Sequence, residues 1–353
     1  MLKFLLPLNF RFTSLLLVIL IAVVSTQVSC RQNETTRIEF ALGTVCVVSL
    51  FDNGQDKIYN DIFSRLREIE NLMSVNIPSS DVSRVNASSG IEPVIVHENV
   101  FTVIERAKYF AELSLGAFDP TVGPLVSLWG IGSDNQRVPS LSEIEKAISL
   151  INWRIIELNA ETKSVFLTET GMALDLGAIA KGYAADETAL AAIRAGVKRA
   201  KIDLGGNIIL IGEKTDKTPW RVGIQNPEKE RGNILGIAQT SAPLNFPALK
   251  TIVTSGIYER NFEENGKRYH HIFDPSTGYP SYNGLLSVTI ITNISMDADA
   301  LSTAVFVLGY EKGSALLESF PETEAIFVFE DRSVKTTPGA NFTLTDTSYR
   351  IEH

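Results

Sequence analysis

The chain carries, near its C-terminus, the stretch Met-Asp-Ala-Asp-Ala-Leu-Ser-Thr-Ala at residues 296–304. An apolar, strand-like run (Leu286–Thr292) precedes it, and the pattern predicts a helix that continues from it to about Leu308. Asp299 and Thr303 are four residues apart, so on a helix their side chains lie on one face. A carboxylate and a hydroxyl aligned in this way offer two hard oxygens to one cation, and magnesium suits such a site. The alternative is a plain N-cap cluster, because negative charge is favoured at a helix start.

Composition limits the kinds of partner. The 353 residues have 44% hydrophobic content, enough for a large core, and a formal net charge of −9. No run of basic residues occurs, so nucleic acid is not an expected partner. An acidic protein that binds an anionic substrate needs local help from a metal, a helix N-terminus or a few placed cations.

The N-terminus has the pattern of a targeting segment. Lys3 and Arg11 supply positive charge, and Ser14–Val24 is apolar, so residues 1–29 are predicted to be a secretory signal peptide. Cys30 follows small residues in a pattern that resembles the lipobox of bacterial lipoproteins, although Gln27 stands where that pattern usually has an aliphatic residue. We therefore expect lipidation at Cys30 and a tether over residues 30–37. A folded domain is expected over residues 38–353, which is long enough for two subdomains. A single uncleaved anchor is the alternative.

Apolar periodicity predicts helices and strands that do not alternate strictly, which favours an α+β fold. A strand is expected at Ile38–Phe51 and a polar loop at Asn76–Gly90. Paired glycines at 205–206 interrupt an expected strand at Ala200–Leu210, which indicates a bulge or a close backbone approach. Besides the helix to Leu308, the expected helices include Gln55–Met73, Asn99–Leu115, an alanine-rich helix ending near Arg194, and Lys312–Ser319.

Polar residues combine with glycine in four stretches that a plain core does not need. These stretches are Asp175–Lys181, Asp203–Asn207, Thr254–Arg260 with the following His270–Pro280, and the Asp299/Thr303 pair. The two adjacent histidines, His270 and His271, point to opposite faces if they lie in a strand, so at most one of them faces a given site. That histidine is a candidate base or orienting donor, with a hydrogen-bonded structural histidine as the alternative.

Taken together, these stretches resemble the ApbE family, the FAD:protein FMN transferases. Seven landmarks occur in the order found in that family: Leu42-Gly43-Thr44, Ala117–Leu125, Leu174–Gly182, Asp203–Asn207, Thr254-Ser255-Gly256, His271-Ile272 with Asp274-Pro275 and Thr277-Gly278, and Asp299–Ala304. The resemblance implies a T-fold-related α+β structure, with mixed helices and a largely antiparallel sheet. It also implies FAD bound in a cleft between two subdomains.

The resemblance further implies an enzyme that uses Mg²⁺ and FAD at the periplasmic side of the bacterial inner membrane. It would transfer FMN through a phosphoester to a threonine or serine of a partner flavoprotein and release AMP. In the family, the metal ligands correspond to the backbone carbonyl of Ala178 and the side chains of Asp299 and Thr303. His271 is the candidate for accepting the hydroxyl proton, with Asp299 as its rival. The flavin nucleotide would contact the positions of Leu42, Asn76, Ala117, Phe118, Asp119, Asp175, Lys181, His271 and Ile272.

One position departs from the family pattern. An aromatic side chain that can stack on the nucleotide is usual where this chain has Asn76. Such stacking is worth about 1–3 kcal/mol, so its absence predicts faster nucleotide exchange and Mg-dependent hydrolysis of FAD to FMN and AMP beside the transfer. A competing class is a lipoprotein that carries FAD without chemistry, and a third is a purely structural surface lipoprotein, which the clustered glycines disfavour.

Overall fold

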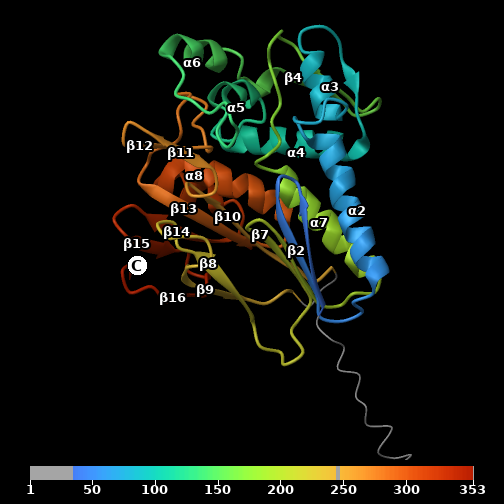
Figure 1. Cartoon of the computed structure of the whole chain (residues 1–353), viewed down its shortest axis with the longest axis vertical. Helices are drawn as coiled ribbons and strands as arrows, with labels where there is room; N and C mark the ends of the chain where they lie inside the picture. The colour runs from blue at the N-terminus through green and yellow to red at the C-terminus, as the bar shows by residue number, and fades with distance from the viewer. Residues whose placement is uncertain (1–34, 244–246, 353) are drawn as a thin grey trace, which may run out of the picture.

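The computed structural model describes residues 35–243 and 247–352 and is built on one large, mostly antiparallel sheet. Its nine strands are ordered β1-β2-β6-β7-β10-β13-β14-β15-β17, and only the last pair is parallel (Figure 1). The α+β prediction is therefore confirmed. The strands are β1 (Thr35–Ala41), β2 (Thr44–Leu50), β6 (Ala200–Leu204), β7 (Asn207–Ile211), β10 (Leu249–Gly256), β13 (Leu285–Thr292), β14 (Glu324–Phe329), β15 (Ser333–Thr336) and β17 (Arg350–Ile351).

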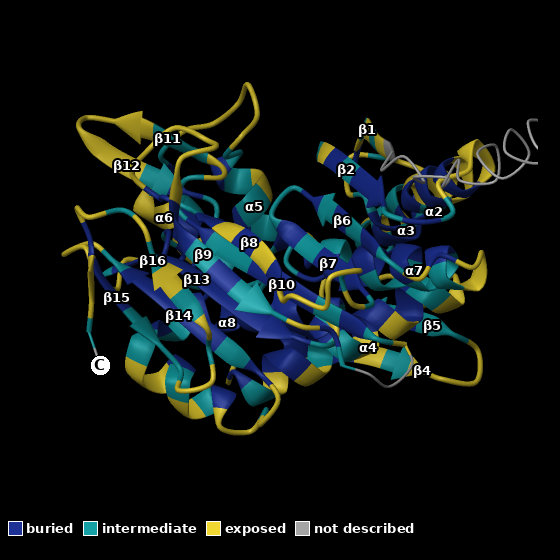
Figure 2. Cartoon of the chain, turned by 90° about the horizontal axis from the view of Figure 1, so that it is seen from below, coloured by how far each residue is buried: buried dark blue, intermediate teal, exposed yellow. Residues whose placement is uncertain are grey.

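Both faces of the central strands are covered. Helices α7 (Ala180–Arg194) and α8 (Ser295–Leu317) pack on one face. A second apolar cluster on the other face joins these strands to a small sheet of β16 (Phe342–Leu344), β9 (Ile234–Thr240) and β8 (Trp220–Gln225). Every residue of β13 is buried as a result, and Figure 2 shows this buried band beneath β8 and β9. A continuous apolar run such as that of β13 is what a strand covered on both faces requires.

A second layer lies beyond one end of the sheet, at the top of Figure 1. It includes a small three-stranded sheet and several helices, while α2 (Asp56–Met73) runs from it alongside the β1–β2 hairpin. A separate hairpin projects near α5 and α6 (Figure 1). The elements are α3 (Asp81–Ala87), β3 (Val94–Ile95), α4 (Glu98–Leu113), α5 (Gly123–Trp129), α6 (Leu141–Ile148), η1 (Trp153–Ile155), β4 (Ile156–Asn159), β5 (Ser164–Leu167), and the hairpin β11 (Asn261–Glu264) and β12 (Lys267–His270).

Two strand predictions are wrong because the chain turns back where we expected it to continue. The expected strand Ile38–Phe51 is the hairpin β1–β2, whose two-residue turn has positive φ at Leu42 (54°) and Gly43 (68°). The expected bulge at 205–206 is the turn between β6 and β7. Gly205 has φ 68°, and a Cβ there would lie 2.1 Å from Thr44 Oγ1, so glycine is required by conformation and by the close approach of the first hairpin.

The helix predictions are mostly confirmed, with two corrections. The polar loop Asn76–Gly90 contains α3, which Ser80 caps by accepting a hydrogen bond from Ser83 N and which buries Val82 and Val85. The two helices expected on either side of Leu308 meet across a kink in α8 at Gly309, which has φ 77° and ψ 176°. Asn283 Nδ2 donates to the Phe306 carbonyl at 2.6 Å, so a side chain satisfies one backbone group near the kink.

The predicted signal peptide, Cys30 and most of the tether lie outside the described residues. Within the part that the structure describes, no helix has the length and apolar character needed to cross a bilayer.

Candidate active site

Asp299 is a buried carboxylate held between two helices. Asp299 belongs to α8, and its Oδ2 accepts a hydrogen bond at 2.9 Å from the backbone N–H of Gly182, which lies in the first turn of α7. Its Oδ1 lies 3.6 Å from Lys181 Nζ, and that ammonium also donates to the Gly177 carbonyl at 3.0 Å. The side chain is only 5% exposed. The helix N-terminus and the lysine thus both place positive charge beside the carboxylate.

Close packing of α7 on α8 brings these groups together. A Cβ at Gly182 would lie 2.2 Å from the Ser295 carbonyl oxygen, so a larger residue would push the two helices apart. Glycine in the first turn of α7 therefore has a packing reason, and it lets the N–H of the same residue reach Asp299.

Thr303 lies one turn after Asp299 in α8, beside the Thr254-Ser255-Gly256 landmark at the end of β10. Ser255 Oγ is 3.3 Å from Thr303 Oγ1 and 2.8 Å from Ser302 Oγ. Ser302 Oγ in turn donates to the Asp299 carbonyl at 2.9 Å. Three hydroxyls and the Asp299 main-chain carbonyl thus meet near the start of α8, although Ser255 and Thr303 are 48 residues apart.

The oxygen atoms gathered at the start of α7 and α8 are of the kind that bind a hard cation. No cluster of three or more His, Cys, Asp and Glu side chains capable of holding a metal occurs within residues 35–243 and 247–352. A metal here would therefore use the Asp299 carboxylate with neutral oxygens, and Mg²⁺ accepts such ligands. Ala178 lies directly before the N-cap residue of α7, four residues from Gly182, so its carbonyl belongs to the same junction. The Lys181 ammonium already lies between a carboxylate and a carbonyl, which shows that the junction accommodates positive charge.

Asp297 does not act as a plain N-cap, which was the alternative for this acidic stretch. Both of its carboxylate oxygens accept hydrogen bonds from Arg106 of α4, at 2.8 and 2.6 Å. The N-terminal N–H groups of α8 are bound instead by Asp186 of α7, which accepts from Ser295 N and Met296 N. Burial raises the pKa of Asp186 to about 7 against the effect of these two hydrogen bonds, and the negative charges of Asp297 and Glu187 add to the rise.

His271 is held by the backbone of the segment before β11. Its Nδ1 lies 3.2 Å from the Arg260 carbonyl oxygen, and its backbone N–H donates to the same oxygen. A carbonyl oxygen only accepts, so the contact assigns the proton to Nδ1 and leaves Nε2 with a free lone pair. Burial lowers the pKa of His271 to about 3, so the ring is neutral at physiological pH.

His270 points the other way, as strand alternation predicts. Its Nε2 lies 3.0 Å from the Ser281 carbonyl, its Nδ1 accepts from Ile272 N, and burial lowers its pKa to about 4. Ile272 is itself buried, at 4% exposure. His270 therefore ties two segments together, and of the two histidines only His271 has a nitrogen suited to a base.

Two of the predicted nucleotide contacts share a cavity. A space of about 380 Å³ is lined by Asn76 after α2 and by Asp175 before α7. Asp175 Oδ1 accepts from Gly177 N at 2.8 Å, and burial raises its pKa against the opposing charges of Arg260 and Lys181. The remaining lining residues are Val75, Ser83, Asn86, Gly123, Val126, Ser127, Ala173 and Leu174.

Asn86 lies outside every stretch that the sequence singled out for function, and Arg260 ends one of those stretches without a predicted role. Asn86 of α3 makes two hydrogen bonds to the backbone of Leu174, with its Nδ2 donating at 3.0 Å and its Oδ1 accepting at 2.7 Å, and so positions the segment before Asp175. Arg260 lies at the tip of the β1–β2 hairpin, since a Cβ at Gly43 would be 3.4 Å from its guanidinium. No local pattern predicts what either residue contacts, because each contacts residues far away in the sequence.

In the landmark at residues 117–119, the side chains of Phe118 and Asp119 contact other residues of the fold. Phe118 is buried in the core, and Asp119 accepts from Thr121 N, Thr121 Oγ1 and Trp153 N. Any nucleotide contact made by Ala117, Phe118 or Asp119 therefore falls to their backbone groups more than to these side chains. Leu42, at the hairpin turn, is half-buried against the core in a left-handed conformation that is uncommon for leucine.

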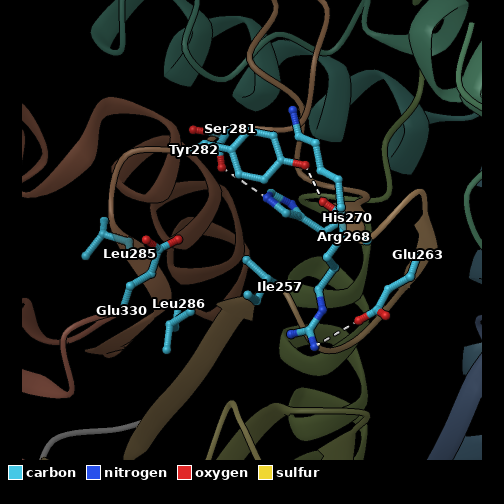
Figure 3. Close-up of a pocket in the computed structure, with 11 residues that line it drawn as sticks. Ile257, Glu263, Arg268, His270, Ser281, Tyr282, Leu285, Leu286 and Glu330 are labelled. Atoms are coloured by element: carbon cyan, nitrogen blue, oxygen red, sulfur yellow. Dashed lines mark hydrogen bonds and ion pairs between the residues drawn. The ribbon is translucent and has the colours of Figure 1, made fainter.

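A larger cavity of about 530 Å³ lies beneath the β11–β12 hairpin (Figure 3). In that view Tyr282, His270 and Arg268 line one side, and Ile257, Leu286 and Glu330 line the other. It contains His270 and none of the predicted site residues, so the smaller cavity beside Asn76 is the better candidate for nucleotide binding.

Comparison with known proteins agrees with this assignment of motifs. The model of the ApbE family matches residues 42–327. An FAD:protein FMN transferase of Treponema pallidum is 38% identical over 341 residues, covering 92% of each chain, and one of Klebsiella pneumoniae is 38% identical over 293 residues, covering 83% of this chain and 88% of the relative.

Solved structures give the same result. The crystal structure of the ApbE protein from Thermotoga maritima aligns with a TM-score of 0.75 at 33% identity, covering 90% of this chain and 98% of that one. The flavin transferase ApbE from Vibrio cholerae aligns with a TM-score of 0.74 at 27% identity, covering 89% and 98%. This chain is a member of the ApbE family.

Proposed function

We propose that this protein is a Mg²⁺-dependent FAD:protein FMN transferase that modifies a threonine or serine of a partner flavoprotein. The observation that carries the proposal is the convergence of Asp299, Thr303 and Ser255 at the start of α7 and α8, in a chain whose relatives are named for this activity. Neither a structural lipoprotein nor a passive carrier needs a buried carboxylate held by a lysine and a helix N-terminus.

The reaction replaces the phosphoanhydride bond between the two halves of FAD with a phosphoester bond to the acceptor. The acceptor oxygen forms a bond to the phosphorus of the FMN half, and the bond from that phosphorus to the AMP oxygen breaks. The acceptor hydroxyl loses its proton, and AMP leaves with the displaced oxygen. Enzymes of phosphoryl transfer act mainly by positioning the reactants and stabilising charge, so the protein needs few groups for this chemistry.

His271 is the proposed proton acceptor. Its Nδ1–H is engaged by the Arg260 carbonyl, so Nε2 is presented as a base in one fixed tautomer. A pKa of about 3 keeps the ring unprotonated before the reaction. The negative charge of a nearby pyrophosphate would raise that pKa and strengthen the base when substrate is bound.

Asp299, Thr303 and the Ala178 carbonyl are the proposed ligands of Mg²⁺. When bound, the metal would neutralise the pyrophosphate and the charge that develops on the leaving oxygen. Lys181 and Arg260 are placed to add positive charge, as their opposing effects on the pKa of Asp175 indicate. A protein with a net charge of −9 needs such local cations to bind a doubly negative substrate.

Hydrolysis of FAD is proposed as an accompanying activity. Asn76 is exposed on the wall of the nucleotide cavity and lacks a ring for stacking. Water that enters from this side would replace the acceptor hydroxyl and yield FMN and AMP.

We also propose that Cys30 is lipidated and holds the enzyme at the periplasmic side of the inner membrane, because residues 1–30 have the signal and cysteine pattern described above.

The direct test is incubation of the full chain with FAD, Mg²⁺ and candidate periplasmic flavoproteins, followed by mass spectrometry of the acceptor. The expected result is addition of one FMN to a threonine or serine, together with an equal amount of AMP. Binding of FAD with neither modification nor AMP release in the presence of every acceptor would instead identify a carrier.

A further inference from the structure

The outer face of the β1–β2 hairpin exposes apolar side chains beside the active site. Ile38 is 63% exposed, Phe40 is 74% exposed and Val45 is 47% exposed. Phe40 and Val45 are partners in the hairpin register, and Ile38 lies two residues from Phe40 on the same face. We call these three residues the hairpin face. Contiguous exposed apolar side chains of this kind mark interaction sites more often than isolated ones do.

The opposite side of the hairpin is already occupied. Arg37 and Glu39 alternate with the apolar residues and pair with α2, through Arg37 to Asp56 and Glu39 to Arg67. The small sheet β16-β9-β8 packs over β7, β10, β13 and β14 but leaves the hairpin face uncovered. The exposure of these side chains is therefore a property of the fold and not a consequence of fraying.

The backbone of β1 is also available for pairing. Among the described residues β1 has one neighbour, β2, and stands at the end of the sheet. The two-residue turn at Leu42-Gly43 makes Ala41 and Thr44 the hydrogen-bonded closing pair, so the N–H and C=O groups of Ile38 and Phe40 point to the free edge. An apolar edge strand of seven residues is normally shielded, because it otherwise promotes aggregation.

We infer that the hairpin face and free edge of β1 dock an extended segment of the acceptor protein, and this inference rests on the proposed function. The hairpin that carries the face also carries Leu42, and its turn lies against Arg260, whose carbonyl holds His271. Four residue steps of about 3.3 Å separate Ile38 from Leu42 along the strand. A segment paired with β1 would therefore bring a hydroxyl a few residues further on to the proposed base.

Charge favours a polypeptide over a lipid surface at this face. The face that contains Ile38 and Val47 continues on β6 as a short row of one anion and one cation, Asp203 and Lys201, and the chain has a net charge of −9. An anionic membrane is normally met by clustered lysine and arginine, which this row lacks among the described residues. Strand addition instead uses main-chain hydrogen bonds for affinity and alternate side chains for specificity.

The test compares the double variant Ile38→Ser/Phe40→Ser with Leu141→Ser/Ile95→Ser in the full chain. The second pair removes equally exposed apolar side chains (61% and 66%) from α6 and β3. We expect the hairpin variant to raise the KM for the acceptor about tenfold or more, with kcat at saturating acceptor and FAD affinity unchanged. The control should match the wild type. Ile38→Pro, which removes a free donor without breaking a ladder bond, should raise KM more than Ile38→Ser does.

An unchanged KM in the hairpin variant would overturn the inference. It would also be overturned if the variant lost only self-association in analytical ultracentrifugation, or only binding to vesicles of anionic phospholipid, since the occupant would then be a second copy or a membrane. Failure of the wild type to add FMN to any acceptor is a separate result that overturns the proposed function itself.

Discussion

His271 Nδ1 lies 3.2 Å from the carbonyl oxygen of Arg260, and this contact decides what the histidine can do. The ring is fixed as the Nδ1–H tautomer, so its second nitrogen remains a base. The neighbouring histidine uses its own ring nitrogens inside the fold.

Replacing His271 by Asn should keep the hydrogen bond to the Arg260 carbonyl and remove the base. The Asn amide can still donate to Arg260 from roughly the position of Nδ1, but it has no counterpart to Nε2. We expect kcat for FMN transfer to fall about 10²–10⁴-fold with FAD affinity retained. His270→Gln is the matched control, because its amide can reach the Ser281 carbonyl, and it should lower thermal stability more than kcat. Equal losses of kcat in both variants would contradict the assignment.

The same histidine predicts a pH profile. A pKa of about 3 means that the base is protonated, and therefore inactive, only in strongly acidic solution. In kcat/KM for FAD, which reports the free enzyme, no acid limb from His271 is expected between pH 5 and 7. A limb with a midpoint near 6.5 that disappears in His271→Asn would show that the ring is more solvated than the structure indicates.

Asp299→Asn should abolish Mg-dependent chemistry while preserving the fold. The amide oxygen can still accept the Gly182 N–H bond, but the charge that would hold a cation is lost. We expect AMP release from FAD to fall by at least about 10²-fold and Mg²⁺ binding, measured by calorimetry, to be lost. Asp297→Asn is the control: it breaks the bidentate pair with Arg106 and should lower stability with Mg²⁺ binding retained. Mg²⁺ binding that survives in Asp299→Asn would refute the proposed ligand set.

Asn76→Tyr should change the balance between transfer and hydrolysis. A ring at this exposed position on the cavity wall can stack on the nucleotide, which is worth about 1–3 kcal/mol, or roughly five- to 150-fold in affinity. We expect slower acceptor-independent AMP release and FAD that stays bound through gel filtration. Asn76→Leu controls for apolar bulk without a ring. Undetectable AMP release by the wild-type protein without an acceptor would rule out the hydrolysis.

Asp186 predicts a pH dependence of stability. Burial raises its folded-state pKa to about 7, above the ordinary value of 3.8 for an aspartate, so the folded protein holds a proton that the unfolded chain releases. The contribution of this group to the free energy of unfolding is therefore full below about pH 4 and is lost as pH rises towards 7, by about 1–3 kcal/mol.

Denaturant unfolding of Asp186→Asn at pH 4.5 and 7.5 checks this expectation. The variant should lose the part of the pH slope that Asp186 contributes, whereas Asp61→Asn, at an exposed pair with Lys57, should keep it. An identical slope in wild type and Asp186→Asn would show that the buried carboxylate does not titrate in this range.

Much of this protein could be read from local sequence. The 3.6-residue periodicity of Asp56–Met73 specifies an amphipathic helix, and the apolar run of Leu285–Thr292 specifies a strand covered on both faces. The spacing of Asp299 and Thr303 places them on one helix face, and the order of the glycine-containing landmarks indicates the family. These features depend on residues within a few turns of one another, so local sequence contains the information.

Other features depended on contacts between distant residues. The hairpin turn at Leu42-Gly43 was missed because apolar residues continue through it, and only the pairing of β1 with β2 shows where the strand ends. Asp297 and Asp299 are two residues apart, yet one is committed to Arg106 and the other to Gly182. Their roles differ because residues two apart on a helix point to different sides of it, and α4 and α7 pack on different sides of α8. Local sequence determined which groups the site contains, and the tertiary structure decided which of them face one another, because burial and hydrogen-bond partners come from segments far apart in the chain.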